Sequence, residues 1–267
     1  RWMKILAGLG TVYLYVQVTG GQPSALRAFL MIACLWGARI VRRQSNPFPA
    51  LVASAVLILA VDPAQVRNLG FQFSYAVVSV ILLYGLPLAE QLKTWTAPRR
   101  DMLPERSVPL LFRLLDWGRQ WLILVFSVSL SATLASTPLT IANFGLATPG
   151  TIFLNLLLVT LAGIAIKLGA ASVLAGVAGL GFVSTLANPL ANQLIGFMVL
   201  LVDNSLRIPG FFQEVQMRHP LLGQLGILLL VGTLLCCHQC RERLRRHFFW
   251  IPPAVFAIYL ALTSTHG

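Results

Sequence analysis

Long uninterrupted apolar runs dominate this sequence, and they restrict its fold more than any other feature. The clearest run covers residues 73–88, where the only polar side chains are hydroxyls. With Phe71 and Ala89 added it is long enough to cross a membrane, since roughly 20 helical residues span the ~30 Å hydrocarbon core. A transmembrane β-barrel would instead show short segments of alternating polarity. The runs therefore predict an all-α protein, a polytopic transmembrane helical bundle.

The composition agrees with this fold class. Among the 267 residues, 57% are hydrophobic and only 10% are charged, and the mean hydropathy is +0.78. About 25% of residues are charged in a typical soluble domain. The net charge of +12 has a topological explanation, because Lys and Arg collect in cytoplasmic loops. Affinity for nucleic acid is the alternative explanation.

We expect about nine membrane spans and one amphipathic helix that lies at the membrane interface. Residues 151–182 are long enough for two spans, divided at Lys167, and Pro138 ends the span before them. The interfacial helix is expected at residues 186–202, where Asn188 and Asn192 contribute to a polar side. The other spans are expected at residues 5–18, 24–40, 47–61, 70–88, 117–135, 221–235 and 248–262.

Basic segments predict on which side of the membrane each loop lies. If residues 39–43, 93–119 and 241–246 and Lys167 are cytoplasmic, the apolar runs cross in alternation with none left over. Residues 19–24, 62–70 and 137–150 then share the outer face, and Gly267 lies outside. The chain begins at Arg1 with no signal-peptide pattern. We expect one membrane domain over residues 1–267, either a fragment of a longer protein or a shortened relative.

Arg27 and Asp62 are the most unusual residues at the outer face. Arg27 lies about one turn into the second expected span, and Asp62 ends the third span at the same depth. A cation inside an apolar segment costs roughly 3 kcal/mol unless it is paired, so Arg27 is a candidate for function. Two interpretations remain open: a structural ion pair with Asp62, or contact between the guanidinium and a passing phosphate.

Two blocks of sequence lie at the same expected face. The first reads Asp62-Pro63 and then Gly70-Phe71-Gln72-Phe73-Ser74-Tyr75. Its aromatic rings are either stacking surfaces for nucleic-acid bases or interfacial anchors. The second contains Thr137-Pro138-Leu139-Thr140, Asn143-Phe144-Gly145, Pro149-Gly150 and Asn155. It predicts either a re-entrant segment that lines a cavity or an ordinary turn outside the membrane.

Both blocks resemble the ComEC competence-protein family, the inner-membrane channel proteins of bacterial DNA uptake. The family patterns are D-P … G-F-Q-L-S-F and T-x-P-L … F-G … P … N, and this sequence departs from the first at Phe73 and Tyr75. The resemblance covers about residues 20–210. It implies a channel that passes single-stranded DNA across the bacterial inner membrane during natural transformation. The residues expected along the DNA path are Arg27, Asp62, Gly70, Phe71, Gln72, Ser74, Tyr75, Asn143, Phe144, Gly145 and Asn155.

The resemblance also implies partners and predicts what this chain lacks. The expected partners are single-stranded DNA, the lipid bilayer, a cytoplasmic helicase-like motor, DNA-receptor proteins and further copies in a homo-oligomer. The OB-like and metallo-β-lactamase-like domains of the family have no counterpart here, so we expect no enzymatic activity. Two other functions remain open, a transporter of a small molecule or lipid and a membrane scaffold for a nuclease domain.

We expect no cofactor and no metal site. Thiolate and imidazole are preferred zinc ligands, and several lie close together near the end of the chain. The paired C-x-x-C knuckles of zinc ribbons are missing there, which favours free cysteines. The residues in question are Cys236, Cys237, His238, Cys240 and His247.

Overall fold

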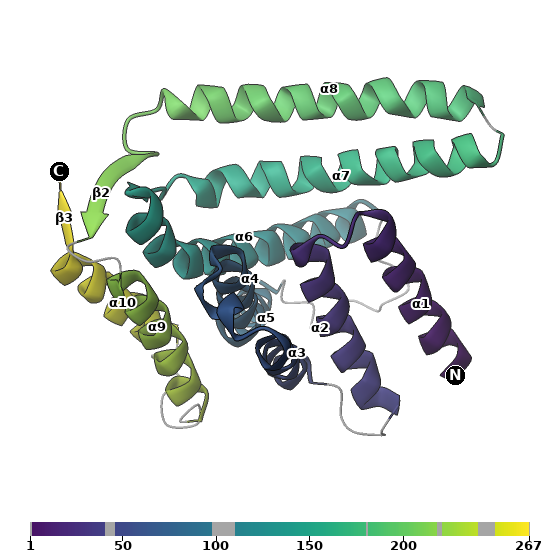
Figure 1. Ribbon diagram of the computed structural model, residues 1–267. Helices are drawn as coiled ribbons and strands as arrows, with labels where there is room; N and C mark the ends of the chain where they lie inside the picture. The colour runs from purple at the N-terminus through teal and green to yellow at the C-terminus, as the bar shows by residue number, and fades with distance from the viewer. Residues whose placement is uncertain are drawn as a thin grey trace, which may run out of the picture.

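A computed structural model describes residues 2–40, 46–97, 110–179, 181–217, 221–239 and 249–266. Within these ranges most residues are helical, and three short strands form one small sheet (Figure 1). The α-helices are α1 (Trp2–Val18), α2 (Pro23–Ile40), α3 (Pro47–Val61), α4 (Leu69–Val80), α5 (Leu86–Trp95), α6 (Leu110–Phe144), α7 (Thr151–Val177), α8 (Gly181–Leu206), α9 (Leu221–Gln239) and α10 (Ile251–Thr263). The other elements are the 3-10 helix η1 (Pro63–Arg67), the π-helical turn η2 (Ile81–Gly85) and the strands β1 (Leu146–Ala147), β2 (Gln213–Met217) and β3 (Ser264–His266).

The prediction of an all-α bundle of membrane helices is confirmed. Five helical segments in the described ranges are long and apolar enough to cross a membrane: Leu69–Trp95, Leu111–Phe144, Thr151–Val177, Thr185–Leu206 and Leu221–Gln239. Four apolar helices of 10–17 residues accompany them: Met3–Val18, Pro23–Ala38, Pro47–Val61 and Ile251–Thr263. Five helices in the described ranges are thus long enough to be candidate spans, and the other four apolar helices are shorter than the length used for a span, so the count of about nine spans stays a prediction.

The region from residue 151 to residue 206 differs from the prediction. Residues 151–177 form one helix, α7, and not two spans. Lys and Leu are good helix formers and one Gly costs only about 1 kcal/mol relative to Ala, so the Lys167 region does not break the helix. The helix ends instead before Gly179, whose φ of 76° is left-handed and suits glycine.

The helix expected at the interface, residues 186–202, is part of α8, which is long and apolar enough to span a membrane. Figure 1 shows α7 and α8 side by side as a long hairpin. The prediction places two spans within residues 151–182 and an interfacial helix after them, whereas the structure has one candidate span in α7 and one in α8. The number of crossings in this region is thus the same. The predicted side of every other loop is therefore unchanged. Small buried residues permit the close approach of the pair: Ala165, Ser172, Ala175, Ala187 and Ala191.

Pro138 is predicted to end a helix, but it lies inside α6. Proline lacks the N–H that would bond the carbonyl four residues earlier. It is tolerated at membrane depth where neighbouring helices and hydroxyl side chains surround it. Here Gly223 and Gly226 of α9 pack directly on Pro138: a β-carbon at Gly226 would lie 3.1 Å from Pro138 Cβ, and one at Gly223 would lie 2.8 Å from its carbonyl oxygen.

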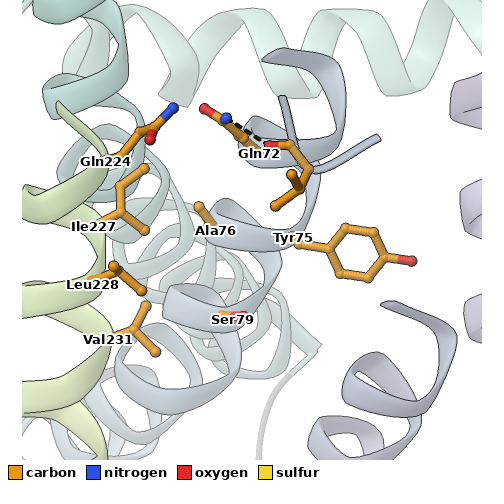
Figure 2. Close-up of a pocket in the computed structure, with 9 residues that line it drawn as sticks. Gln72, Tyr75, Ala76, Ser79, Gln224, Ile227, Leu228 and Val231 are labelled. Atoms are coloured by element: carbon orange, nitrogen blue, oxygen red, sulfur yellow. Dashed lines mark hydrogen bonds between the residues drawn. The ribbon is translucent and has the colours of Figure 1, made fainter. Parts of the chain in front are cut away.

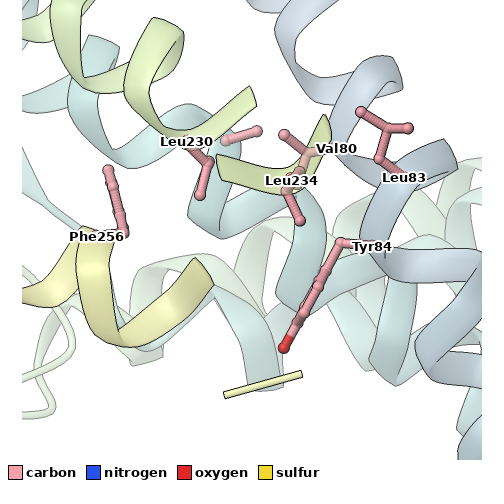
Figure 3. Packing of buried hydrophobic residues seen from close by; sticks show 7 residues of the cluster. Val80, Leu83, Tyr84, Leu230, Leu234 and Phe256 are labelled. Atoms are coloured by element: carbon pink, nitrogen blue, oxygen red, sulfur yellow. The ribbon is translucent and has the colours of Figure 1, made fainter. Parts of the chain in front are cut away.

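One core cluster joins the middle of the chain to its last helices. Figure 3 shows residues of α4 and η2 packed against residues of α9 and α10. The buried members are Val80, Leu83, Tyr84, Ala135, Leu230, Leu234 and Phe256. The hydroxyl of Tyr84 donates a hydrogen bond to the Phe249 carbonyl at 3.1 Å. This cluster fixes the position of α4 relative to α9.

The small sheet connects three distant parts of the sequence. β2 pairs antiparallel with β1 and with β3, so that Leu146 lies opposite Glu214 and Gln216 lies opposite Thr265. The predicted loop positions place all three segments on the outer face. Their meeting in one sheet agrees with that assignment, although which side is outer stays a prediction.

Candidate nucleic-acid interface

The segment between α3 and α4 is held by its own side chains. One carboxylate oxygen of Asp62 accepts from the Ala64 N–H at 3.1 Å, and the other accepts from Gln65 Nε2 at 2.9 Å. Asn68 caps α4 by accepting from the N–H groups of Gly70 at 2.8 Å and Phe71 at 3.3 Å. Asx residues at these positions satisfy donors that a helix start leaves unpaired. The first motif block therefore begins α4 at a defined point.

Arg27 lies in the second turn of α2 and is buried, with only 8% of its surface exposed. Its Nε is buried without a hydrogen-bond partner, and no ion pair to Arg27 occurs in the described part of the chain. The ion pair with Asp62, one of the two interpretations of Arg27, is thus not formed, because the Asp62 carboxylate is occupied within its own loop. A buried guanidinium nitrogen without a hydrogen-bond acceptor is costly.

Arg27 and Asp62 nevertheless line the same pocket of about 430 Å³, which we call the Arg27 pocket. Gln65 adds a third polar group to it. The other lining residues are Gly21, Pro23, Leu26, Leu30, Leu57, Ile58 and Val61. The pocket therefore combines one cation and few other polar groups with apolar walls from α2 and α3.

The Gly at position 70 is explained by the Arg27 side chain. A β-carbon on Gly70 would lie 3.3 Å from Arg27 Nη2 and 3.1 Å from Asn68 Oδ1. Both contacts are tighter than ordinary van der Waals packing. The first motif block thus contributes its backbone, and not only its side chains, to the surroundings of the cation.

Phe71 and Tyr75 face α2 and α3 and belong to a second core cluster with Leu51. Their ring centroids are 4.5 Å apart, and 7% and 9% of their surfaces are exposed. Ser54 Oγ donates to the Leu51 carbonyl at 2.7 Å, so the Tyr75 hydroxyl must be the donor in its 3.2 Å contact with Ser54 Oγ. In this conformation the two rings are packing residues and do not offer free faces to bases.

Gln72 lies on another face of α4 and lines a second pocket of about 320 Å³ between α4 and α9 (Figure 2). Its Nε2 donates to the Val66 carbonyl at 2.8 Å, whereas its Oε1 is buried without a partner. Ser74 is half-buried on α4 and lines neither pocket.

The second motif block lies at the junction of α6, β1 and α7. Asn143 Nδ2 donates to the Leu139 carbonyl at 2.9 Å, and Gly145, with φ of 66°, begins the turn into β1. Phe144 is 60% exposed, and Asn155 is half-buried in the second turn of α7. None of these residues lines the Arg27 pocket. The expected single group of path residues is therefore distributed over three places.

Several expected features lie outside the described residues. They include Cys240, His247, most of the basic loop at 93–113 and the basic residues 241–246. Within the described ranges, no group of three or more His, Cys, Asp or Glu residues is placed to hold a metal ion.

Comparison with known proteins identifies the family. The model of the family described as "Competence protein" matches residues 1–241. The chain belongs to the competence protein family. Its match to ComE operon protein 3 of Bacillus subtilis (strain 168) is 35% identical over 81 residues, which is 30% of this chain and 10% of that protein. The competence-family chain thus aligns with only a tenth of this curated relative. No solved structure is significantly similar to this chain.

The motif blocks did not indicate three residues of the site. Asn68 could have been found, since Asn immediately before a helical apolar run is a cap signal. Gln65 and Gln224 carry no such signal, because their positions in the pockets depend on how η1 and α9 pack.

Proposed function

We propose that this helical domain passes single-stranded DNA across the bacterial inner membrane during natural transformation. In this proposal Arg27 contacts a phosphate of the strand. Family membership supports the connection with DNA uptake. The site is supported by the largely buried Arg27 in its pocket, whose Nε has no hydrogen-bond partner and which forms no ion pair among the described residues. A guanidinium matches phosphate geometry, and a phosphate would supply the partner that Arg27 lacks.

The roles of the other path residues follow from their positions. Asp62 and Gln65 keep one wall of the Arg27 pocket polar, and Gly70 leaves room for the guanidinium. Phe71 and Tyr75 support the α2 to α4 packing from behind and do not stack on bases. The DNA strand would meet a separate group of residues beside the β-sheet, namely Asn143, Phe144, Gly145 and Asn155. The partners that we propose for such a path are a cytoplasmic motor, DNA receptors and further copies of the chain.

DNA uptake in a naturally transformable host tests the role of Arg27. The host would carry, as its only copy, the full-length gene with Arg27→Leu, and membrane insertion would be measured alongside uptake of labelled DNA. Since hydrogen bonds to charged groups contribute about 1.5–3 kcal/mol, we expect uptake to fall by about tenfold or more. Arg27→Lys keeps the charge but loses the planar fork of donors, so its DNA uptake should lie between that of the parent protein and that of Arg27→Leu.

The control is Arg67→Leu, which removes an exposed cation from η1, in the same segment as Asp62 and Gln65. It should leave uptake close to normal. Normal uptake by an inserted Arg27→Leu variant would reject Arg27 as a phosphate contact. Equal losses in both variants would indicate a general effect of surface charge.

A small-molecule or lipid transporter and a passive scaffold are the competing functions. Binding of an oligonucleotide that contacts phosphates weakens steeply with salt, because bound counterions are released. The DNA path therefore predicts a steep salt dependence for the full-length protein in detergent, with a smaller slope for Arg27→Leu. Either competing function predicts no specific oligonucleotide binding.

A further inference from the structure

The second pocket is a groove with a regular construction, and we call it the glutamine groove. Its walls are Gln72, Ala76 and Ser79 on α4 and Gln224, Ile227, Leu228 and Val231 on α9, with Val66 and Tyr75 at its edge. Both helices use the spacing i, i+4, i+7, which places residues on one helical face. Figure 2 shows the two stripes running in the same direction, with both glutamines at the same end. Seven residues at 1.5 Å rise make the groove about 10 Å long.

The polarity of the groove changes along its length. Gln72 and Gln224 are each the fourth residue of their helices, so they lie near the helix starts. Below them the walls are mainly aliphatic, from Ala76, Ile227, Leu228 and Val231. Both helices are candidate membrane spans, so the polar end lies toward the membrane surface and the apolar end lies within the hydrocarbon. A phospholipid has the same order of polarity.

The polar end requires a hydrogen-bond donor from the ligand. Gln72 Nε2 is engaged with the Val66 carbonyl, and this bond orients the amide so that Oε1 is the free atom. That oxygen is buried and has no partner among the described residues. A buried acceptor without a partner costs about 1–3 kcal/mol. An ammonium or a hydroxyl on a lipid head group can supply the missing bond.

We propose that the glutamine groove binds one acyl chain of a phospholipid whose head group donates a hydrogen bond to Gln72. The lining contains no charged residue, which disfavours a nucleotide with its phosphate. The groove is also open along one side, between two candidate spans, so a lipid can enter from the membrane. The lipid fills the gap between α4 and α9. This site is distinct from the Arg27 pocket and does not depend on DNA passage.

Photolabelling in nanodiscs tests the chain-binding part. The full-length protein would be reconstituted in phosphatidylethanolamine that contains a trace of the same lipid with a diazirine on its acyl chain. Labels should concentrate on residues 72–79 and 224–231. Leu228→Trp fills the groove, whereas Leu225→Trp changes an exposed leucine of α9 outside it; the two leucines are 69% and 53% exposed. Labelling of the groove peptides should fall several-fold in the first variant and stay unchanged in the second.

Competition between lipids tests the head-group part. Phosphatidylethanolamine and phosphatidylglycerol, which carry donors, should displace the label several-fold better than phosphatidylcholine, which has none. Gln72→Leu should abolish this preference while the groove is still labelled. Equal labelling all around α9, unaffected by Leu228→Trp, would overturn the proposal because it would indicate ordinary boundary lipid. Labelling of these peptides by a photoreactive oligonucleotide, and not by lipid, would assign the groove to DNA.

Discussion

The Arg27 guanidinium lies against the backbone of Gly70, so close that a β-carbon at position 70 would be 3.3 Å from Nη2. The two residues come from α2 and α4, and no hydrogen bond or ion pair joins them in the described ranges. The relationship is therefore steric: the absence of a β-carbon at Gly70 leaves room for the Arg27 guanidinium, whose Nε has no hydrogen-bond partner. The position of the cation thus depends on a residue without a side chain.

Gly70→Ala should shift both Arg27 and the Asn68 cap while α4 stays helical. Alanine favours helices, so the backbone of α4 tolerates the change, but the guanidinium and the Asn68 side chain must each give by a few tenths of an ångström. We expect DNA uptake to fall several-fold while membrane insertion stays normal. Gly10→Ala is the matched control, since a β-carbon there meets nothing within 4 Å. Unchanged uptake in Gly70→Ala would show that the exact position of Arg27 is unimportant.

Tyr75→Phe should lower stability by about 1 kcal/mol, the usual net contribution of one hydrogen bond. The change removes the hydroxyl that donates to Ser54 but keeps the ring that packs on Phe71. Thermal unfolding of the purified protein in detergent measures the effect. Tyr15→Phe, at a tyrosine that is 64% exposed, should leave the unfolding temperature unchanged. A Tyr75→Phe variant as stable as the parent would contradict the assigned bond.

Gly85→Ala should separate η2 from α6. The added methyl would lie 2.6 Å from Ser131 Oγ and 3.2 Å from Ser131 Cβ, so the buried serine side chain or its helix must shift. Overpacking of this kind costs about 1–3 kcal/mol. Ser131→Ala in the same chain removes Oγ and should restore part of the loss, which thermal unfolding would reveal. Gly118→Ala on α6 is the control, because the space around it is open.

Cysteine labelling tests the predicted sides of the membrane. In a chain whose four native cysteines are replaced, Glu214→Cys on β2 should react with an impermeant maleimide added outside the cell. Ala178→Cys, in the turn between α7 and α8, should react only after permeabilisation. The reverse pattern would invert the whole assignment. Labelling of both positions from outside would mean that the hairpin of α7 and α8 does not cross the membrane.

The long apolar runs made most helices predictable. The runs at 24–40, 47–61 and 221–235 lie within or coincide with α2, α3 and α9. The helices differ from the prediction where a single residue suggests a break. Lys167 is exposed and Pro138 packs against two glycines of α9, so neither ends its helix. Local propensity does not contain this information, because the surroundings of each residue decide the outcome.

The site was predictable only in part, and for a similar reason. Arg27 was indicated by its charge within an apolar run, and Asp62 and Gly70 by the motif block. That Asp62 would bond within its own loop is a local feature, because Asp before Pro63 caps η1. The burial of Phe71 and Tyr75 depends on how α2 and α3 pack against α4. Gln224 is far from Gln72 in the sequence, and only the packing of α9 beside α4 places the two at one end of a groove.

The three-stranded sheet has a mechanical consequence. β1 follows α6, β2 precedes α9 and β3 follows α10, so backbone hydrogen bonds join one end of each of these helices. The sheet therefore adds backbone pairing to the side-chain packing of Ala135, Leu234 and Phe256, which holds the same three helices together elsewhere. Separating α6, α9 and α10 at the sheet requires breaking β2 away from β1 or β3, because β2 is the central strand.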